Sequence, residues 1–187
     1  PEEEGEAPAV KLERREEIER VKCQVCELAV AEGHELVERE ALYQDEDALQ
    51  DAVEALCSVQ KRQGRWLTRL DLEQVEGAIK VVRQSSYGEC RSECLTAQRA
   101  CARSLAGLER DLVQMLSERA DADAVKSRVC KRACKVKLEP LTVRRWDETF
   151  QAKTALEATL LEVADELQAS RRRRSNEAGV QAETEAA

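Results

Sequence analysis

Apolar residues recur at intervals of three and four along most of the chain, a spacing that predicts a mainly helical protein. The first such stretch runs from Lys11 to about Arg39. A second follows the polar residues 44–47, where carboxylates favour a helix start because they stabilise its positive end. Its apolar positions are Leu49, Ala52, Val53, Leu56 and Cys57.

Residues 62–84 have a different pattern. Side chains alternate between apolar and polar from Thr68 to Glu73, Glu76 and Gly77 offer a turn, and residues 78–83 are rich in β-formers. We therefore predict a β-hairpin inserted between helices. A helix is the alternative, because the same apolar residues also fit a 3.6-residue period.

Helical spacing returns in the second half of the chain. One predicted helix runs through Leu105 and Leu116, and Asp121 or Asp123 can cap the next, which carries Cys130 and Cys134. Pro140 then ends the cysteine-containing region, and residues 154–169 form a last amphipathic helix.

These patterns divide the chain into four parts. We expect a disordered acidic leader over 1–10, a disulfide-stapled helical domain over 11–139, a linker and C-terminal helix over 140–170, and a disordered tail over 171–187.

Composition narrows the class of protein. Only 3% of the 187 residues are aromatic, so the hydrophobic core must rely on Leu, Val and Ala. The net charge of −8 argues against a nucleic-acid binder. No apolar run approaches the roughly 20 residues of a membrane span, so we expect no transmembrane segment.

The eight cysteines, at positions 23, 26, 57, 90, 94, 101, 130 and 134, indicate an oxidising compartment. Disulfides would compensate for a thin core, and we expect a protein of the secretory pathway. The chain begins with Pro1 rather than Met, which suggests that a signal peptide has been removed.

Two other uses of the cysteines stay open. Cys23 and Cys26 could join Cys130 and Cys134 in a zinc site, although all four lie in helix-forming sequence without the turn residues of zinc knuckles. Cys23 and Cys26 could also form a redox-active pair, although such a pair prefers a helix N-terminus.

Catalytic chemistry has few candidate residues. His34 is the single histidine, and we expect it on a solvated helix face. The seven glycines form no phosphate-binding loop. We predict a non-enzyme without a cofactor.

The cysteine motifs together resemble the saposin B-type domain and, more closely, the Canopy family with its plant and algal relatives. The resemblance covers roughly residues 20–150, and its motifs are Cys23-Gln-Val-Cys26, Glu54-Ala-Leu-Cys57, Trp66-Leu-Thr-Arg-Leu-Asp-Leu, Gly88-Glu-Cys-Arg-Ser-Glu-Cys94, Ala100-Cys101 and Val129-Cys130-Lys-Arg-Ala-Cys134.

The resemblance implies a helical, disulfide-bonded protein of the endoplasmic reticulum lumen, or a secreted one. Its partner would be a client protein or a chaperone, and its role would be assistance to folding or trafficking. The alternative is a saposin-like protein that binds lipid or a membrane surface.

The resemblance also implies a nested disulfide order: Cys23–Cys134, Cys26–Cys130 and Cys57–Cys101, with Cys90–Cys94 left as a local pair. The closing pair is more tightly spaced here than in the family, so exchanged outer pairs (Cys23–Cys130 and Cys26–Cys134) are an alternative. A Cys23–Cys134 bond closes a loop of about 111 residues, which stabilises the fold by roughly 4–5 kcal/mol in the chain-entropy model.

Charge suggests where a partner could bind. Residues 13–40 hold nine acids and five bases, whereas residues 126–145 hold eight bases and one acid. The basic side chains could meet an acidic partner or be balanced by the first helix; they are Lys126, Arg128, Lys131, Arg132, Lys135 and Lys137.

Arg171–Arg174 form a second basic cluster. It could cap the C-terminal end of the last helix, where cations are favoured. A protease-processing site and a nuclear signal are the alternatives, although the latter conflicts with a disulfide-bonded protein.

Overall fold

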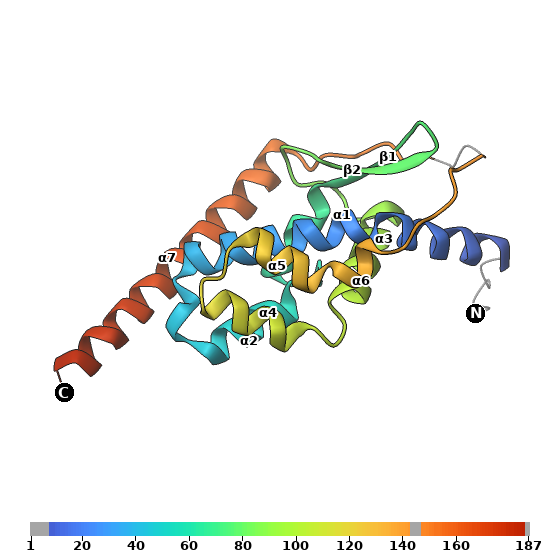
Figure 1. The fold of residues 1–187 in the computed structure, drawn as a ribbon. Helices are drawn as coiled ribbons and strands as arrows, with labels where there is room; N and C mark the ends of the chain where they lie inside the picture. Colours follow the sequence, from blue (N-terminus) through green and yellow to red (C-terminus); the bar gives the residue numbers. More distant parts are fainter. Residues whose placement is uncertain (1–7, 143–146, 186–187) are drawn as a thin grey trace, which may run out of the picture.

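The computed structural model describes residues 8–142 and 147–185 and confirms a mainly helical fold with four disulfides, one hairpin and a C-terminal helix (Figure 1). Its elements, in chain order, are α1 (Pro8–Glu40), η1 (Leu42–Gln44), α2 (Glu46–Ala55), η2 (Arg62–Arg69), β1 (Leu70–Val75), β2 (Ala78–Arg83), α3 (Ser92–Leu105), α4 (Glu109–Ser117), α5 (Ala122–Val129), α6 (Lys131–Cys134) and α7 (Ala155–Glu185).

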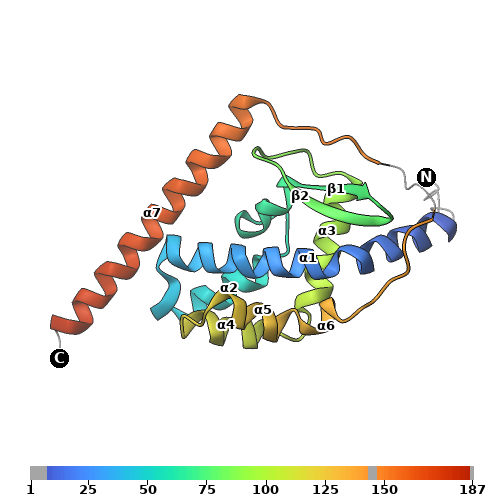
Figure 2. The same ribbon diagram turned by 45° about the horizontal axis from the view of Figure 1, so that its top comes forward.

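The long helix α1 is the centre of the domain. It contacts α3, α5, α6 and β2, so helices and the hairpin surround it on several sides (Figures 1 and 2). Its inward positions are fully buried at Val21, Val25, Ala29 and Val30. The predicted three-and-four spacing of the first helix is therefore the spacing of its core face.

The short helices begin where the sequence offers caps. Asp45 accepts a hydrogen bond from the backbone N of Ala48 at 2.9 Å and starts α2. Asp121 accepts from the backbone N atoms of Asp123 and Ala124 and starts α5. These carboxylates satisfy donors that the first turn of a helix leaves unpaired.

The hairpin prediction is confirmed and the helical alternative is wrong. β1 pairs antiparallel with β2, with Leu72 opposite Val81. Glu76 and Gly77 form the two-residue turn with positive φ values of 48° and 78°. A turn with two positive φ values matches the twist of paired strands, which explains why Gly77 stands there.

Two expected disordered segments are helical in the structure. Residues 8–10 belong to α1, while residues 1–7 lie outside the described part. The last helix does not end near residue 170 but continues to Glu185. The segment after Ala169 contains no proline, and two of its arginines are anchored on the domain: Arg172 lies 4.0 Å from Asp45, and Arg173 donates to the carbonyl of Glu38.

The segment before α7 is attached to the domain along its length. Gly88 and Ala152 form an isolated antiparallel bridge, and the backbone N of Glu89 donates to the carbonyl of Gln151 at 2.8 Å. The ring of Phe150 lies against Gly88, where a Cβ would approach ring atoms to 2.6 Å. Glycine at position 88 therefore allows the segment to dock.

Candidate functional site

The eight cysteines lie in described residues, and all are paired. Two bonds join α1 to the α5–α6 region, one joins the end of α2 to α3, and one closes the start of α3; the pairs are Cys23–Cys134, Cys26–Cys130, Cys57–Cys101 and Cys90–Cys94. This is the nested order that the family resemblance implies, and the exchanged pairing is not the one found.

Disulfide formation changes what the sulfur atoms can do. Cys23, Cys134 and the carboxylate of Glu27 lie close enough together to hold a metal ion, and Glu27 is 3.9 Å from each sulfur. The two sulfurs are bonded to each other, however, and a disulfide does not supply the thiolates that zinc requires. In this state the cysteines serve as crosslinks.

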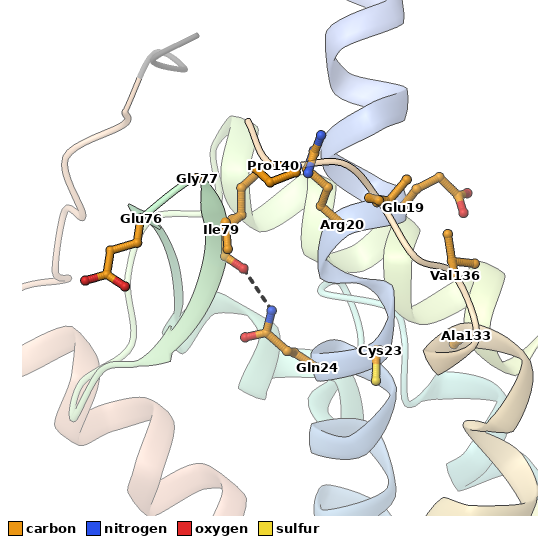
Figure 3. A pocket seen from close by; sticks show the side chains of 12 residues that line it. Glu19, Arg20, Cys23, Gln24, Glu76, Gly77, Ile79, Ala133, Val136 and Pro140 are labelled. Carbon is orange, nitrogen blue, oxygen red and sulfur yellow. Dashed lines mark hydrogen bonds between the residues drawn. The ribbon is translucent and has the colours of Figure 1, made fainter. Parts of the chain in front are cut away.

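A groove of about 330 Å³ lies beside the Cys23–Cys134 bond. Three segments that are distant in sequence form its walls (Figure 3). They are α1 (Glu19, Arg20, Cys23 and Gln24), the hairpin tip (Glu76, Gly77, Ala78 and Ile79) and the chain after α5 (Ala133, Val136, Leu138 and Pro140).

Side-chain hydrogen bonds fix these walls relative to one another. The amide of Gln24 donates to the carbonyl of Ile79 at 2.9 Å (Figure 3). It also accepts from the backbone N of Val81 at 2.9 Å. It thereby satisfies backbone groups on the outer edge of β2, which would otherwise stay open for pairing. Arg20 donates to the carbonyl of Glu139 at 2.7 Å, so the groove is held on two sides.

The third wall exposes apolar side chains between cations. Val136 is 42% and Leu138 is 40% exposed. Their neighbours Lys135 and Lys137 are exposed and make no ion pair with another residue that the structure describes. This wall can therefore accept apolar side chains and attract carboxylates at the same time.

The six predicted partner-binding cations are not equivalent. Lys126 lies 3.5 Å from Asp123, Arg128 lies 3.1 Å from Asp111, and Arg132 donates to the carbonyl of Ala106. Lys131, Lys135 and Lys137 are exposed and lack such partners within residues 8–142 and 147–185. Three of the six cations therefore have local partners, and the other three could bind an acidic partner protein.

The acidic residues of α1 pair elsewhere. α1 lies beside α5 and α6, as the charge pattern suggested. Its carboxylates nevertheless pair with basic side chains from η2, β2 and α3, namely Glu40 with Arg62, Glu32 with Arg83 and Glu19 with Arg103. The carboxylates of α1 therefore do not neutralise the charges of Lys131, Lys135 and Lys137.

A second hollow lies beneath α7 and is rich in paired charges. Arg65 donates to Asp165 at 2.8 Å, and the Tyr87 hydroxyl donates to the same carboxylate at 3.1 Å. Arg69 stacks over the Tyr87 ring and also pairs with Glu162. Burial raises the pKa of Tyr87, an effect that Arg69 opposes. Because Asp165 and Glu162 belong to α7, this hollow is the place where α7 docks on the domain.

His34 differs from its expected position on a solvated face. It is half-buried on α1, and its Nε2 atom is buried without a hydrogen-bond partner in the described part of the chain. Gly33 beside it faces Leu116 and Leu56, so this side of α1 packs against α4 and the end of α2.

Comparison with known proteins gives one result: no family model, no curated protein and no solved structure matches the chain. The resemblance to the Canopy family therefore rests on the cysteine motifs. Among the described helices, none combines the length and apolarity that crossing a membrane requires. Four disulfides fit a secreted or lumenal protein.

Proposed function

We propose that this chain is a non-enzymatic binding protein of the secretory pathway. In this proposal the groove beside Cys23–Cys134 holds an extended segment of a client protein or chaperone. The observation that carries the proposal is the wall at residues 135–138, where exposed Val136 and Leu138 alternate with lysines. A segment that alternates apolar and acidic side chains has the matching chemistry.

The disulfides support this role by keeping the groove in one shape. Cys23 lines the groove, and its bond to Cys134 ties α1 to the start of the exposed wall. A preformed site loses less conformational entropy on binding than a flexible one does. Kinship with the Canopy family, residence in the endoplasmic reticulum and assistance to folding or trafficking belong to the same proposal and agree with such a surface.

The test is binding of a fluorescent peptide that alternates Leu and Glu, followed by anisotropy. We expect saturable binding, weakened at least tenfold in the Val136→Glu/Leu138→Glu variant because like charges then meet the peptide. The Leu160→Glu/Leu167→Glu variant is the matched control and should bind normally, because these leucines lie on α7. A Leu–Lys peptide should bind weakly.

Vesicle flotation at acidic and neutral pH tests the lipid alternative. We expect the protein to stay unbound at both pH values. Equal binding of both peptides, or no peptide binding together with flotation on vesicles, would overturn the proposal and favour a saposin-like lipid-binding protein.

A further inference from the structure

The Cys23–Cys134 bond is the most accessible of the four disulfides. Among the eight cysteines, all of which the structure describes, Cys134 alone is exposed, and Cys23 is half-buried. Cys26 and Cys130, which form the neighbouring bond, are 0% and 1% exposed. The remaining two bonds each join a half-buried cysteine to a buried one. A thiolate breaks a disulfide by direct attack on one sulfur atom, so access decides which bond exchanges first.

The buried neighbour keeps the chain crosslinked when this bond opens. Cys23–Cys134 and Cys26–Cys130 join the same two regions, with sequence separations of 111 and 104 residues. Either bond alone therefore closes the long loop and restricts the unfolded chain to nearly the same extent. We expect the domain to stay folded with Cys26–Cys130 as the single tie between α1 and the α5–α6 region.

The charges beside Cys134 favour an anionic attacker. Lys131 lies one turn earlier on α6 and Lys135 follows directly; both are exposed and have no ion-pair partner in the described part of the chain. Cations of this kind attract a thiolate and speed its encounter with the sulfur. The Glu27 carboxylate lies 3.9 Å from both sulfurs and opposes that attraction, but it can accept a hydrogen bond from the Cys23 thiol once the bond is open.

We propose that Cys23–Cys134 is a thiol-exchange site whose partner is a dithiol oxidoreductase. The partner's first thiolate attacks the Cys134 sulfur, a mixed disulfide forms, and Cys23 leaves as a thiolate that takes up a proton. The partner's second thiolate then attacks the partner's own sulfur in the mixed disulfide, and Cys134 leaves and is protonated in turn. Two electrons and two protons thus pass to the cystine, and the partner ends as a disulfide.

Opening of the bond frees one wall of the groove. Cys134 ends α6 just before the exposed wall at residues 135–138, and Cys23 lines the groove (Figure 3). The wall keeps the hydrogen bonds at Glu139 and Leu141 but loses its nearest covalent anchor. We expect the wall to loosen and the groove to bind more weakly. The weaker binding rests on the function proposed above, whereas exchange at the bond does not.

Alkylation after limited reduction tests the site. The full chain is incubated without denaturant with reduced thioredoxin, quenched in acid, alkylated and mapped by mass spectrometry. Cys23 and Cys134 should be labelled about tenfold or more faster than the other cysteines, while the circular dichroism of the helices stays unchanged. Absence of labelling, earlier labelling of another pair, or loss of the helical signal in step with labelling would overturn the proposal.

A thioredoxin variant that keeps only its attacking cysteine traps the mixed disulfide. The trapped bond should be to Cys134 and not to Cys23. Lys131→Glu should slow trapping about threefold or more at low salt, and less at high salt. Lys61→Glu is the matched control, because it reverses an exposed lysine outside α6, and it should trap faster than Lys131→Glu. Trapping on Cys23 would overturn the assignment of the attacked sulfur, and equal rates for the two variants would overturn the role of Lys131.

Hydrogen exchange separates this proposal from the groove function. In Cys23→Ala/Cys134→Ala the amide of Leu141, which donates to the hairpin tip at 2.7 Å, should exchange faster. Cys90→Ala/Cys94→Ala is the matched control, because it removes a bond at the start of α3, and it should leave Leu141 unchanged. The Leu–Glu peptide should bind the opened variant about tenfold more weakly. Unchanged exchange and affinity would overturn the loosening. Faster exchange at Leu141 with no peptide binding even to the wild-type chain would support the loosening and overturn the groove function alone.

Discussion

The cysteine-containing domain and the α7 helix are held in place by different forces. The domain buries aliphatic side chains from α1 to α5 around four disulfides. The helix α7 buries Ala158 and Ala169 and otherwise docks through hydrogen bonds and ion pairs such as Arg65–Asp165. Apolar burial and crosslinks resist salt and pH better than ion pairs do, so we expect α7 to detach under milder conditions than those that unfold the domain.

The largest effect should come from the two bonds that join α1 to the α5–α6 region. Cys23–Cys134 and Cys26–Cys130 close nearly the same loop, with separations of 111 and 104 residues. Once one bond exists, the other closes only a short ring and adds roughly 2 kcal/mol in the chain-entropy model. Replacing one pair with Ala should therefore cost roughly 2 kcal/mol, and replacing both pairs roughly 6 kcal/mol.

Urea unfolding followed by circular dichroism measures this difference. Cys90→Ala/Cys94→Ala is the control, because that bond spans only 4 residues and should cost roughly 2 kcal/mol in any background. Strictly additive losses for the two long-range bonds would contradict the shared-loop explanation.

Gly88 is the point where the segment before α7 meets the domain. A Cβ at this position would lie 2.6 Å from the Phe150 ring and 3.0 Å from the carbonyl oxygen of Thr68. Gly88→Ala should destabilise the docked segment by about 1–3 kcal/mol, which is typical of overpacking. Limited proteolysis should then cut residues 147–153 faster, while the melting of the domain changes little.

Phe150→Ala provides the control for this clash. Removal of the ring itself loosens the segment, so Gly88→Ala should have a smaller effect in the Phe150→Ala background, where only the 3.0 Å approach to the Thr68 carbonyl oxygen remains. Equal effects of Gly88→Ala in both backgrounds would show that the ring contact is not responsible.

The sequence predicted the parts of this fold that local patterns control. Asp45 and Asp121 were recognisable as helix starts, and Gly77 marked the hairpin turn. The groove could not be predicted, because its walls come from three segments and Gln24 gives no sign of its contact with Ile79. Long-range contacts of this kind have no periodic signal in the sequence.

The end of α7 shows the same limit. A cap at the end of the last helix is one of the roles that the sequence suggests for Arg171–Arg174, but α7 continues to Glu185. Arg173 instead donates to the carbonyl of Glu38 in the last turn of α1, so a cation does stabilise a helix end, but that of a different helix. The preference of cations for the C-terminal end of a helix therefore holds, but the sequence alone does not show that the helix concerned is α1.

A smaller effect should come from the ion pairs that seat α7. The carboxylate of Asp165 accepts from Arg65 at 2.8 Å and from the Tyr87 hydroxyl at 3.1 Å. Asp165→Asn removes the charge, so we expect docking of α7 to weaken by about 1–2 kcal/mol. Hydrogen exchange of residues 158–172 should rise, and high salt should produce a similar change in the wild-type chain.

Glu166→Gln is the matched control for Asp165→Asn. It removes the same charge one position away, where the structure gives no ion pair among the described residues. An equal rise in exchange for both variants would mean that net charge, rather than the Arg65–Asp165 contact, holds the helix in place.

The smallest effect concerns the first turn of α7. The carboxylate of Glu157 accepts from the backbone N of Thr154 at 3.0 Å and from its hydroxyl at 2.6 Å, and these bonds lower the pKa of Glu157 below its usual 4.5. A lowered pKa in the folded state means that the capping contribution is present above pH 4.5 and is lost as the pH falls through the folded value. Exchange of the first-turn amides should therefore rise at acidic pH. In Glu157→Gln the amide side chain does not titrate, so a first turn that still loosened in the same acidic window would assign the change to another group.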